Sequence, residues 1–196
     1  LIVSIGQGNL FLSLILSMLV CIILGMGLPT TAAYVLAAAI LAPPLITLGL
    51  QPLYAHLFVF YFSTLATITP PVCAAVFLSS GIAESKWVKT GFLSVLIAIP
   101  AFVVPYTFVY NPALLVIGEI SNIIISVVTA FAGVYFIGVS IGGYLNCDLG
   151  ILSRVLFMIG GILLLIPNIT LSIIGTIVCI ILFVLCKKSV KVKGVL

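Results

Sequence analysis

The sequence predicts an all-α polytopic integral membrane protein, and three observations support that fold class. Hydrophobic residues make up 64% of the 196 residues and charged residues only 5%, with a mean hydropathy of +1.54. Soluble domains contain roughly a quarter charged residues, so this chain could not cover a surface that faces water. The first charged residue is Glu84, and the apolar segments, at about 20 residues per span, predict about six or seven membrane elements.

The N-terminal part predicts a helical hairpin over about 10–48. Its arms are Leu10–Leu24 and Ala32 to about Leu48, and they are separated by Gly25-Met26-Gly27-Leu28-Pro29-Thr30-Thr31. Two glycines and a proline interrupt the helix where lipid offers the backbone no hydrogen bonds. Such a break is tolerated only where protein buries it or where it lines a cavity. We expect Pro43-Pro44 to kink the second arm or end it early, because proline removes a donor and clashes with the preceding turn.

A second interrupted segment follows over about 53–80. As one helix it would measure about 42 Å, which exceeds the hydrocarbon thickness. Thr69-Pro70-Pro71 lies in its middle. A residue before proline is pushed out of the helical region, so we expect the chain to open near Thr67–Pro71. Two Gly/Pro-interrupted apolar segments are typical of the binding site of a secondary transporter.

The remaining elements are spans separated by short polar segments. Residues 84–118 predict a loop and a membrane helix: the polar loop covers Gly81–Lys89 and the span covers Thr90–Tyr110. Residues 119–196 predict C-terminal membrane helices over about 120–145, 151–166 and 171–186, followed by a basic tail. The last two helices form a hairpin around Pro167-Asn168. The glycosylation pattern Asn168-Ile169-Thr170 is discounted there, because a turn between two apolar helices is poor evidence for it.

Basic residues predict the orientation of the chain. The tail residues Lys187, Lys188, Lys191 and Lys193 directly follow an apolar helix. We interpret them as a cytoplasmic C-terminus by the positive-inside rule, and not as a nucleic-acid patch. Counting spans backwards places all seven basic residues on the inside. Upstream there are no charges, so two arrangements remain. Either about 10–48 is a re-entrant hairpin and about 53–80 a broken crossing, or the roles are exchanged.

An enzyme is a weak interpretation of these residues. The only histidine, His56, lies in the uncharged part of the chain and begins an apolar aromatic run. It is more typical of a packed or interfacial imidazole than of a ligand or proton relay. The sequence contains no carboxylate pair or nucleophile motif, so we name no catalytic residue. The five cysteines are scattered singly and predict small buried hydrophobes, with no transition-metal site.

Neutral oxygens at the two breaks suit a cation. An opened helix frees backbone carbonyls, and Thr30 and Thr31 at the first break and Thr67 and Thr69 at the second add uncharged acceptors. Such a set suits a partly dehydrated Na⁺. Alternatively, these residues merely kink packed helices, with the threonines bonded to their own turns. Two breaks with the same chemistry favour the functional interpretation. Na⁺ is then a coupling ion, and no other cofactor is expected.

A specific set of stretches resembles one known family. These are Gly25–Tyr34, His56–Phe62, Ile68–Val72, Gly81–Ala83, Lys89–Gly91 and Phe108–Leu115. Together they are similar to the large membrane subunit of tripartite ATP-independent periplasmic (TRAP) transporters. The similarity is greatest to the fused permeases that work with TAXI-type binding proteins, and it covers about residues 1–118. The chain is expected to be the C-terminal portion of such a permease.

The resemblance implies an elevator-type secondary importer driven by Na⁺. A periplasmic TAXI-type solute-binding protein would deliver a small organic solute, expected to be a carboxylate. The location would be the cytoplasmic (inner) membrane of a bacterium or archaeon. The missing upstream segment, including the small-subunit part, would complete the permease within the lipid bilayer. The resemblance also favours the re-entrant hairpin for about 10–48, with its tip at 25–31, within a transport domain that includes residues 1–83. A channel-like or structural membrane module, or a polytopic membrane enzyme acting on lipid, are the alternatives.

The resemblance also implies site residues. Gly25 and Gly27 at the hairpin tip, and Thr69 and Val72 at the unwound helix, would line a Na⁺ site. Ala66 stands where related permeases often have Gly or Ser, so its contact with the ion would be through the backbone alone. The residues expected near the substrate are Pro29, Thr30, Thr31, Thr67, Pro70 and Pro71.

Overall fold

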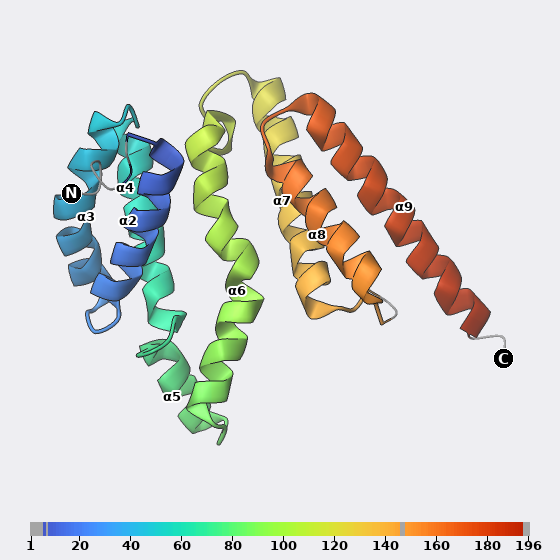
Figure 1. The fold of residues 1–196 in the computed structure, drawn as a ribbon, viewed down its shortest axis with the longest axis horizontal. Helices are drawn as coiled ribbons and strands as arrows, with labels where there is room; N and C mark the ends of the chain where they lie inside the picture. The colour runs from blue at the N-terminus through green and yellow to red at the C-terminus, as the bar shows by residue number, and fades with distance from the viewer. Residues whose placement is uncertain (1–5, 7, 146–147, 194–196) are drawn as a thin grey trace. The chain divides into compact units, whose positions relative to one another are not determined.

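The computed structural model is helical throughout, as predicted. It describes residues 6, 8–145 and 148–193, and the side chains among them up to residue Cys186. The elements are α2 (Leu10–Gly25), α3 (Thr30–Thr47), α4 (Pro52–Leu65), η1 (Ala66–Ile68), α5 (Ala74–Ile82), α6 (Trp87–Tyr110), η2 (Pro112–Leu115), α7 (Ile120–Gly142), α8 (Ile151–Leu165) and α9 (Ile169–Lys193) (Figure 1). The lysines of the basic tail and Cys147 lie outside the residues whose side chains are described.

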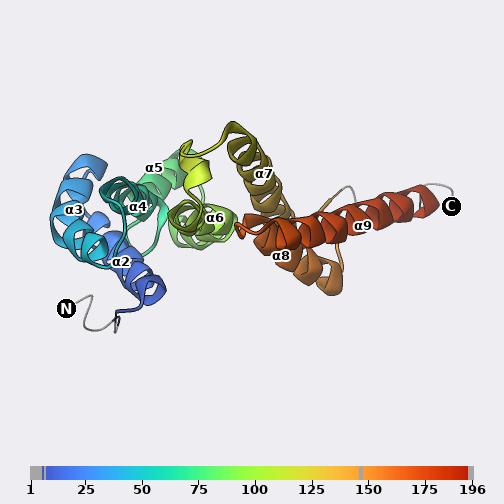
Figure 2. The same cartoon turned by 90° about the horizontal axis from the view of Figure 1, so that it is seen from above.

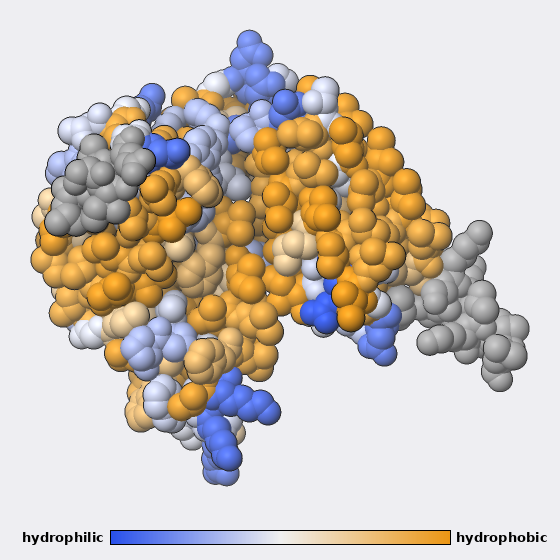
Figure 3. Space-filling model, in the orientation of Figure 1, coloured by the Kyte–Doolittle hydropathy of each residue, from blue (hydrophilic) through white to orange (hydrophobic). Residues whose placement is uncertain are grey.

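Length and composition make this a multi-pass membrane protein. Among the described residues, four helical segments are long and apolar enough to cross a membrane: Thr30–Thr47, Trp87–Tyr110, Ile120–Gly142 and Ile169–Cys186. Shorter apolar helices cover Leu10–Gly25, Pro52–Ile68 and Ile151–Leu165. On the face seen in Figure 3, hydrophobic residues cover the sides of the helices and most hydrophilic residues lie at helix ends. Lipid can solvate such sides, while water solvates the ends.

The chain divides into two compact units, Leu1–Ala98 and Ile99–Leu196. In the first unit, α2, α3 and α4 pack side by side (Figures 1 and 2). Phe58 and Phe62 of α4 are fully buried in the core that these helices share, together with the small side chain of Ala37 from α3. Small residues allow helices to approach closely in lipid, where apolar burial alone gives little drive to associate.

We expected Pro43-Pro44 to kink the second arm or end it early, and the early end was wrong. Helix α3 continues through both prolines and ends at Thr47. The two prolines remove only two adjacent backbone donors, and the buried side chains of Leu41, Ala42 and Leu45 hold the helix against its neighbours on both sides of them. The Thr47 hydroxyl donates to the Pro44 carbonyl at 2.7 Å, which closes the last turn.

Boundaries of α6, α7 and α9 also differ from the predicted ones. Helix α6 begins at Trp87, so the polar loop is shorter than Gly81–Lys89. Helix α7 ends at Gly142, because Gly143 adopts a left-handed conformation with φ +67°. Helix α9 begins at Ile169, since the Asn168 side chain accepts a hydrogen bond from the Thr170 N–H at 3.0 Å.

In the second unit, α7 and α8 are antiparallel neighbours and α8 packs against α9 (Figure 1). Glycines make the first of these contacts close: a Cβ on Gly161 would lie 2.7 Å from Ile137 Cγ1 and 2.9 Å from the Gly133 carbonyl oxygen. The same unit has a buried apolar cluster with members on α7, α8 and α9, which includes Val139, Leu149, Phe157, Leu164 and Cys179. The two helices therefore meet almost backbone to backbone.

Arg154 closes the C-terminal end of α7. Its Nε donates to the Ser140 carbonyl and its Nη2 to the Ile141 carbonyl, each at 2.8 Å. The Ser140 hydroxyl in turn donates to the Arg154 carbonyl at 2.6 Å. The last carbonyls of a helix have no partner within the helix, and a cation at this end also interacts favourably with the helix dipole.

We expect Arg154→Gln to lower the melting temperature of the purified protein in detergent. The change removes the paired donation to Ser140 and Ile141, which is worth about 1–3 kcal/mol for a charged donor. Arg154→Lys should recover only part of the loss, because an ammonium lacks the planar pair of donors. A melting temperature equal to that of the wild type in Arg154→Gln would contradict this role.

Candidate functional site

The first break is a tight turn at the end of α2. Met26 N–H donates to the Ile23 carbonyl at 3.4 Å, and Pro29 is extended with ψ 145°. Ala33 N–H then donates to the Pro29 carbonyl at 2.9 Å and starts α3. The non-helical part is therefore Met26–Pro29, shorter than the predicted 25–31, since Thr30 and Thr31 already belong to α3. Gly27 and Pro29 are exposed at this tip.

The second break overlaps the predicted Thr67–Pro71 but lies two residues later. Helix α4 tightens into the 3₁₀ turn η1, and Thr69 leaves it in an extended conformation (φ −99°, ψ 126°). A cis peptide bond joins Pro70 and Pro71. Cys73 is left-handed, with φ 35°, and α5 starts at the next residue. The chain thus opens over residues 69–73 between two helices.

The prolines change which carbonyls at this break have donors. The Ala66 carbonyl has lost its helical donor at Pro70 and accepts instead from Thr69 N–H at 3.2 Å. The Thr67 carbonyl would receive a helical hydrogen bond from residue 70 or 71, and both are prolines without an N–H. Its own helix therefore supplies no backbone donor.

The threonines at the second break bond to their own turns. The Thr69 hydroxyl donates to the Leu65 carbonyl and the Thr67 hydroxyl to the Thr64 carbonyl, each at 2.8 Å. This is the hydrogen bonding that the purely structural interpretation expects. A hydroxyl that donates its hydrogen still has lone pairs, so neither threonine loses its capacity to face a cation.

The two breaks meet at Gly25 and Ala66. A Cβ on Gly25 would lie 2.5 Å from the Ala66 Cβ and 3.3 Å from the Ser63 carbonyl oxygen. Ala66 is fully buried, and Gly25 is buried as well. The last residue of α2 thus lies directly on the first residue of η1. Two of the predicted site residues, from segments far apart in the sequence, are in contact.

The other predicted residues lie around this contact with varied exposure. Val72 is 45% exposed, and a Cβ on Gly27 would meet nothing within 4 Å. Thr31 and Pro71 are also exposed, whereas the remaining members of the set are partly buried, namely Thr30, Thr67, Thr69 and Pro70. The exposed members of the set leave room for a ligand or for a neighbouring protein segment.

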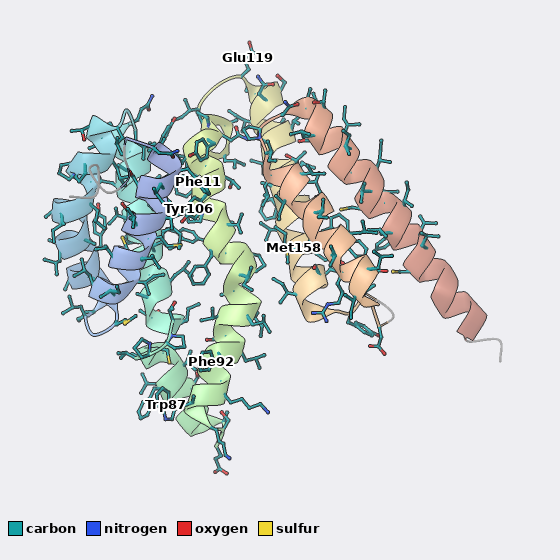
Figure 4. All side chains as sticks on the ribbon, in the orientation of Figure 1. Phe11, Trp87, Phe92, Tyr106, Glu119 and Met158 are labelled. Atoms are coloured by element: carbon teal, nitrogen blue, oxygen red, sulfur yellow. The ribbon has the colours of Figure 1, made fainter. Side chains whose placement is uncertain are left out.

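Helix α6 adds residues that sequence reasoning missed. The Ser94 hydroxyl lies 3.0 Å from the Ile68 carbonyl oxygen, and a Cβ on Gly91 would lie 3.2 Å from Cys73 Sγ. Next to them, an apolar pocket is lined by Pro70, Pro71, Cys73, Trp87, Val88 and Phe92. Figure 4 shows Trp87 and Phe92 on the first turns of α6. Nothing in the sequence distinguishes Ser94 from any other serine in an apolar helix.

Residues 1–123 match the model of a protein family whose description is tripartite ATP-independent periplasmic transporter, DctM component. This range contains both breaks and all of α6. The chain belongs to the DctM family. The DctM family is a family of transporter components and not a family of enzymes. The comparisons with curated proteins and with solved structures gave no match.

The second unit of this DctM chain has a polar pocket that the sequence did not indicate. It lies between the start of α7 and the turn from α8 to α9, and Figure 4 labels Glu119 at that end of α7. Its polar lining consists of Asn111, Glu119, Asn122, Ser126, Thr129, Asn168 and Ser172. Glu119 is the single titratable residue of this lining. The pocket therefore provides no acid–base pair.

The histidine of this DctM chain pairs with a neutral group. The Tyr34 hydroxyl lies 3.1 Å from His56 Nδ1, and the Tyr34 ring contacts the Phe60 ring edge to face. His56 is exposed, which agrees better with an interfacial imidazole than with a packed one. Among the described residues there is also no cluster of three His, Cys, Asp or Glu that could bind a metal ion.

Proposed function

We propose that this chain is part of a Na⁺-coupled, binding-protein-dependent TRAP permease that imports a small organic solute. The observation that supports this most directly is the contact between Gly25 and Ala66, which joins two interrupted helices. Membership in the DctM family supports the transporter class. In this proposal α2 and α3 form a re-entrant hairpin with its tip at 26–29. The hairpin and the broken helix then move together within a transport domain, as an elevator mechanism requires.

The proposed Na⁺ site uses neutral oxygens from both breaks. Gly25, Gly27, Ala66 and Val72 would contribute carbonyls, and Thr69 would contribute its hydroxyl. The chemistry suits a weakly bound hard cation, since residues 1–83 contain no carboxylate that would bind one strongly. The helix ends at these breaks resemble the half-helices that bind coupling ions in other transporters.

The proposed solute is a carboxylate, and the helix N-termini at the two breaks would attract its negative charge. The only arginine of the chain is Arg154, in the second unit. Helices α3 and α5 begin at the two breaks, at Thr30 and Ala74, and their N-terminal ends favour negative charge. Pro29, Thr31, Thr67, Pro70 and Pro71 would then surround the solute near these ends.

The proposed partners follow from the family. A DctM component implies a periplasmic solute-binding protein and further membrane parts of the transporter. We propose a TAXI-type binding protein and an inner-membrane location. The C-terminus would be cytoplasmic, because that orientation places all seven basic residues on the inside.

The sodium dependence of uptake tests this function. In proteoliposomes containing the full-length permease, supplied with its binding protein, Thr69→Ala should raise the half-saturating Na⁺ concentration about tenfold. That factor is what the loss of one ligand, worth about 1–1.5 kcal/mol, would produce. The matched control is Thr64→Ala, which removes a similar bond within α4, from the Thr64 hydroxyl to the Phe60 carbonyl at 3.0 Å.

Three outcomes would contradict parts of the proposal. An unchanged Na⁺ dependence in Thr69→Ala would exclude Thr69 from the site. Wild-type uptake that needs no Na⁺ would exclude the coupling. Solute flux without the binding protein would instead favour a channel-like module.

A further inference from the structure

Helix α6 contacts the second break at two points that are one helical turn apart. Its Ser94 hydroxyl lies 3.0 Å from the carbonyl oxygen of Ile68, the residue before the chain opens. At Gly91, one turn earlier, a Cβ would lie 3.2 Å from Cys73 Sγ, at the far end of the opening, and 3.4 Å from Pro70 Cγ, within it. All of these residues belong to the first unit. Both sides of the break therefore lie against the same short stretch of α6.

The Ile68 carbonyl needs a donor from outside its own helix. In a continuing helix its donor would be Val72 N–H, and in a 3₁₀ turn it would be residue 71, which is a proline. The extended conformation of Thr69 turns the chain away before Val72. Ser94 supplies the donor from 26 residues away along the chain. A partly buried carbonyl that would otherwise be unpaired is thus satisfied by α6.

The same hydroxyl has a second acceptor within reach. Ser94 Oγ lies 2.7 Å from the Gly91 carbonyl oxygen of its own helix. A serine hydroxyl has one hydrogen, so the two carbonyls share it or take it in turn. Ser94 can therefore release Ile68 without leaving its own hydroxyl unpaired.

The close approach at Gly91 explains why the bond can form. A Cβ at this position would lie 3.2 Å from Cys73 Sγ, which is tighter than most real Cβ contacts, and 3.4 Å from Pro70 Cγ, at the near limit of ordinary van der Waals contact. A larger side chain there would push α6 away from Pro70 and Cys73. The Cys73 side chain is fully buried and its backbone is in a left-handed conformation, so the end of the break at Cys73 has little freedom to move. The glycine brings the α6 backbone close enough for Ser94 to reach Ile68.

We propose that Ser94 is a positioning residue for the cation site at the second break. By fixing the Ile68 carbonyl, it holds the neighbouring Thr69 hydroxyl in the orientation that a cation requires. This inference rests on the proposed Na⁺ coupling. Ser94 touches the backbone of the site and does not itself bind the ion.

The test measures solute uptake against Na⁺ concentration in proteoliposomes of the full-length permease with its binding protein. Ser94→Ala should raise the half-saturating Na⁺ concentration about three- to tenfold, the effect of losing one hydrogen bond. Ser94→Thr retains the hydroxyl and should return the value to within about twofold of the wild type. Ser79→Ala is the matched control, because the Ser79 hydroxyl donates to Val76 in its own helix at 3.1 Å.

A second measurement does not depend on transport. Hydrogen–deuterium exchange of the peptide containing residues 67–73 should slow when Na⁺ is added to the wild-type protein. That protection should weaken in Ser94→Ala and return in Ser94→Thr. If Ser94→Ala fails to fold, Ser94→Thr and Ser94→Cys still provide the comparison, because a thiol is a weaker donor than a hydroxyl.

The outcomes separate the inference from the function on which it rests. A wild type that depends on Na⁺, with Ser94→Ala unchanged in both measurements, would overturn the role of Ser94 alone. A wild type without Na⁺ dependence or Na⁺ protection would overturn the proposed coupling and this role with it. An equal shift in Ser79→Ala would show that the effect is not specific to the bond with Ile68, and would also overturn the inference.

Discussion

Gly25→Ala should reduce solute uptake by the full-length permease more than tenfold and lower its thermal stability in detergent. The new Cβ would lie 2.5 Å from the Ala66 Cβ, a distance that real Cβ atoms essentially never show. Ala66 has no flexible side chain that could turn aside, and the Ser63 carbonyl oxygen lies 3.3 Å away on the backbone of α4. The end of α2 must therefore move away from η1. Overpacking of this kind costs about 1–3 kcal/mol, which exceeds the gain from replacing a helical glycine.

Two further variants make this prediction specific. Gly81→Ala is the control, because a Cβ at Gly81 in α5 meets nothing within 4 Å and should leave both uptake and stability close to those of the wild type. The double variant Gly25→Ala/Ala66→Gly removes the Cβ–Cβ clash and should recover most of the loss. Recovery should be incomplete, since the contact with the Ser63 carbonyl remains. A Gly25→Ala protein with normal uptake and melting temperature would show that the two breaks do not touch as described.

Gly161→Ala should cause the largest loss of stability in the second unit. Its Cβ would lie 2.7 Å from Ile137 Cγ1, 2.9 Å from the Gly133 carbonyl oxygen and 3.1 Å from the Ile137 backbone nitrogen. Two of these three atoms are backbone atoms of α7, so α7 and α8 must separate. We expect a cost of about 1–3 kcal/mol, measured as a lower melting temperature of the purified protein in detergent.

Gly138→Ala is the matched control on α7. Its Cβ would meet nothing within 4 Å, and alanine is the better helix former, so the melting temperature should stay the same or rise slightly. Similar losses in both variants would mean that glycine is needed in α7 and α8 for another reason than close packing. An unchanged Gly161→Ala protein would exclude the backbone contact between these helices.

Most helices could be predicted from the sequence, because apolar stretches in lipid must satisfy their backbone groups internally. The predicted first arm agrees with α2 to within one residue, and the predicted 151–166 agrees with α8 equally well. The predicted effect of proline was wrong where packing against neighbouring helices keeps the helix continuous. Pro43-Pro44 leaves α3 intact because buried leucines on both sides hold that helix in place. Pro70-Pro71 does open the chain, at the place where the adjoining residues turn away from α4.

Of the candidate site, too, one part could be predicted from the sequence and another part could not. Gly25–Thr31 and Thr67–Pro71 stand out in the sequence as two breaks with the same threonine and proline chemistry, and the loss of donors at Pro70 and Pro71 follows from composition alone. Ser94 gave no signal, because a serine in an apolar helix usually bonds to its own preceding turn. Its second acceptor, Ile68, becomes visible only when α6 lies against the break.

The sequence by itself therefore determined the class of the molecule, the approximate helices and the two interruptions, since these depend on local backbone chemistry and on transfer into lipid. The tertiary structure alone decided that Gly25 lies on Ala66, that Ser94 reaches Ile68, and that α7 and α8 meet at Gly133 and Gly161. Each of these contacts depends on how closely two helices approach and at which residues they cross. Side-chain packing along the whole length of the helices sets that geometry, and no short stretch of sequence specifies it.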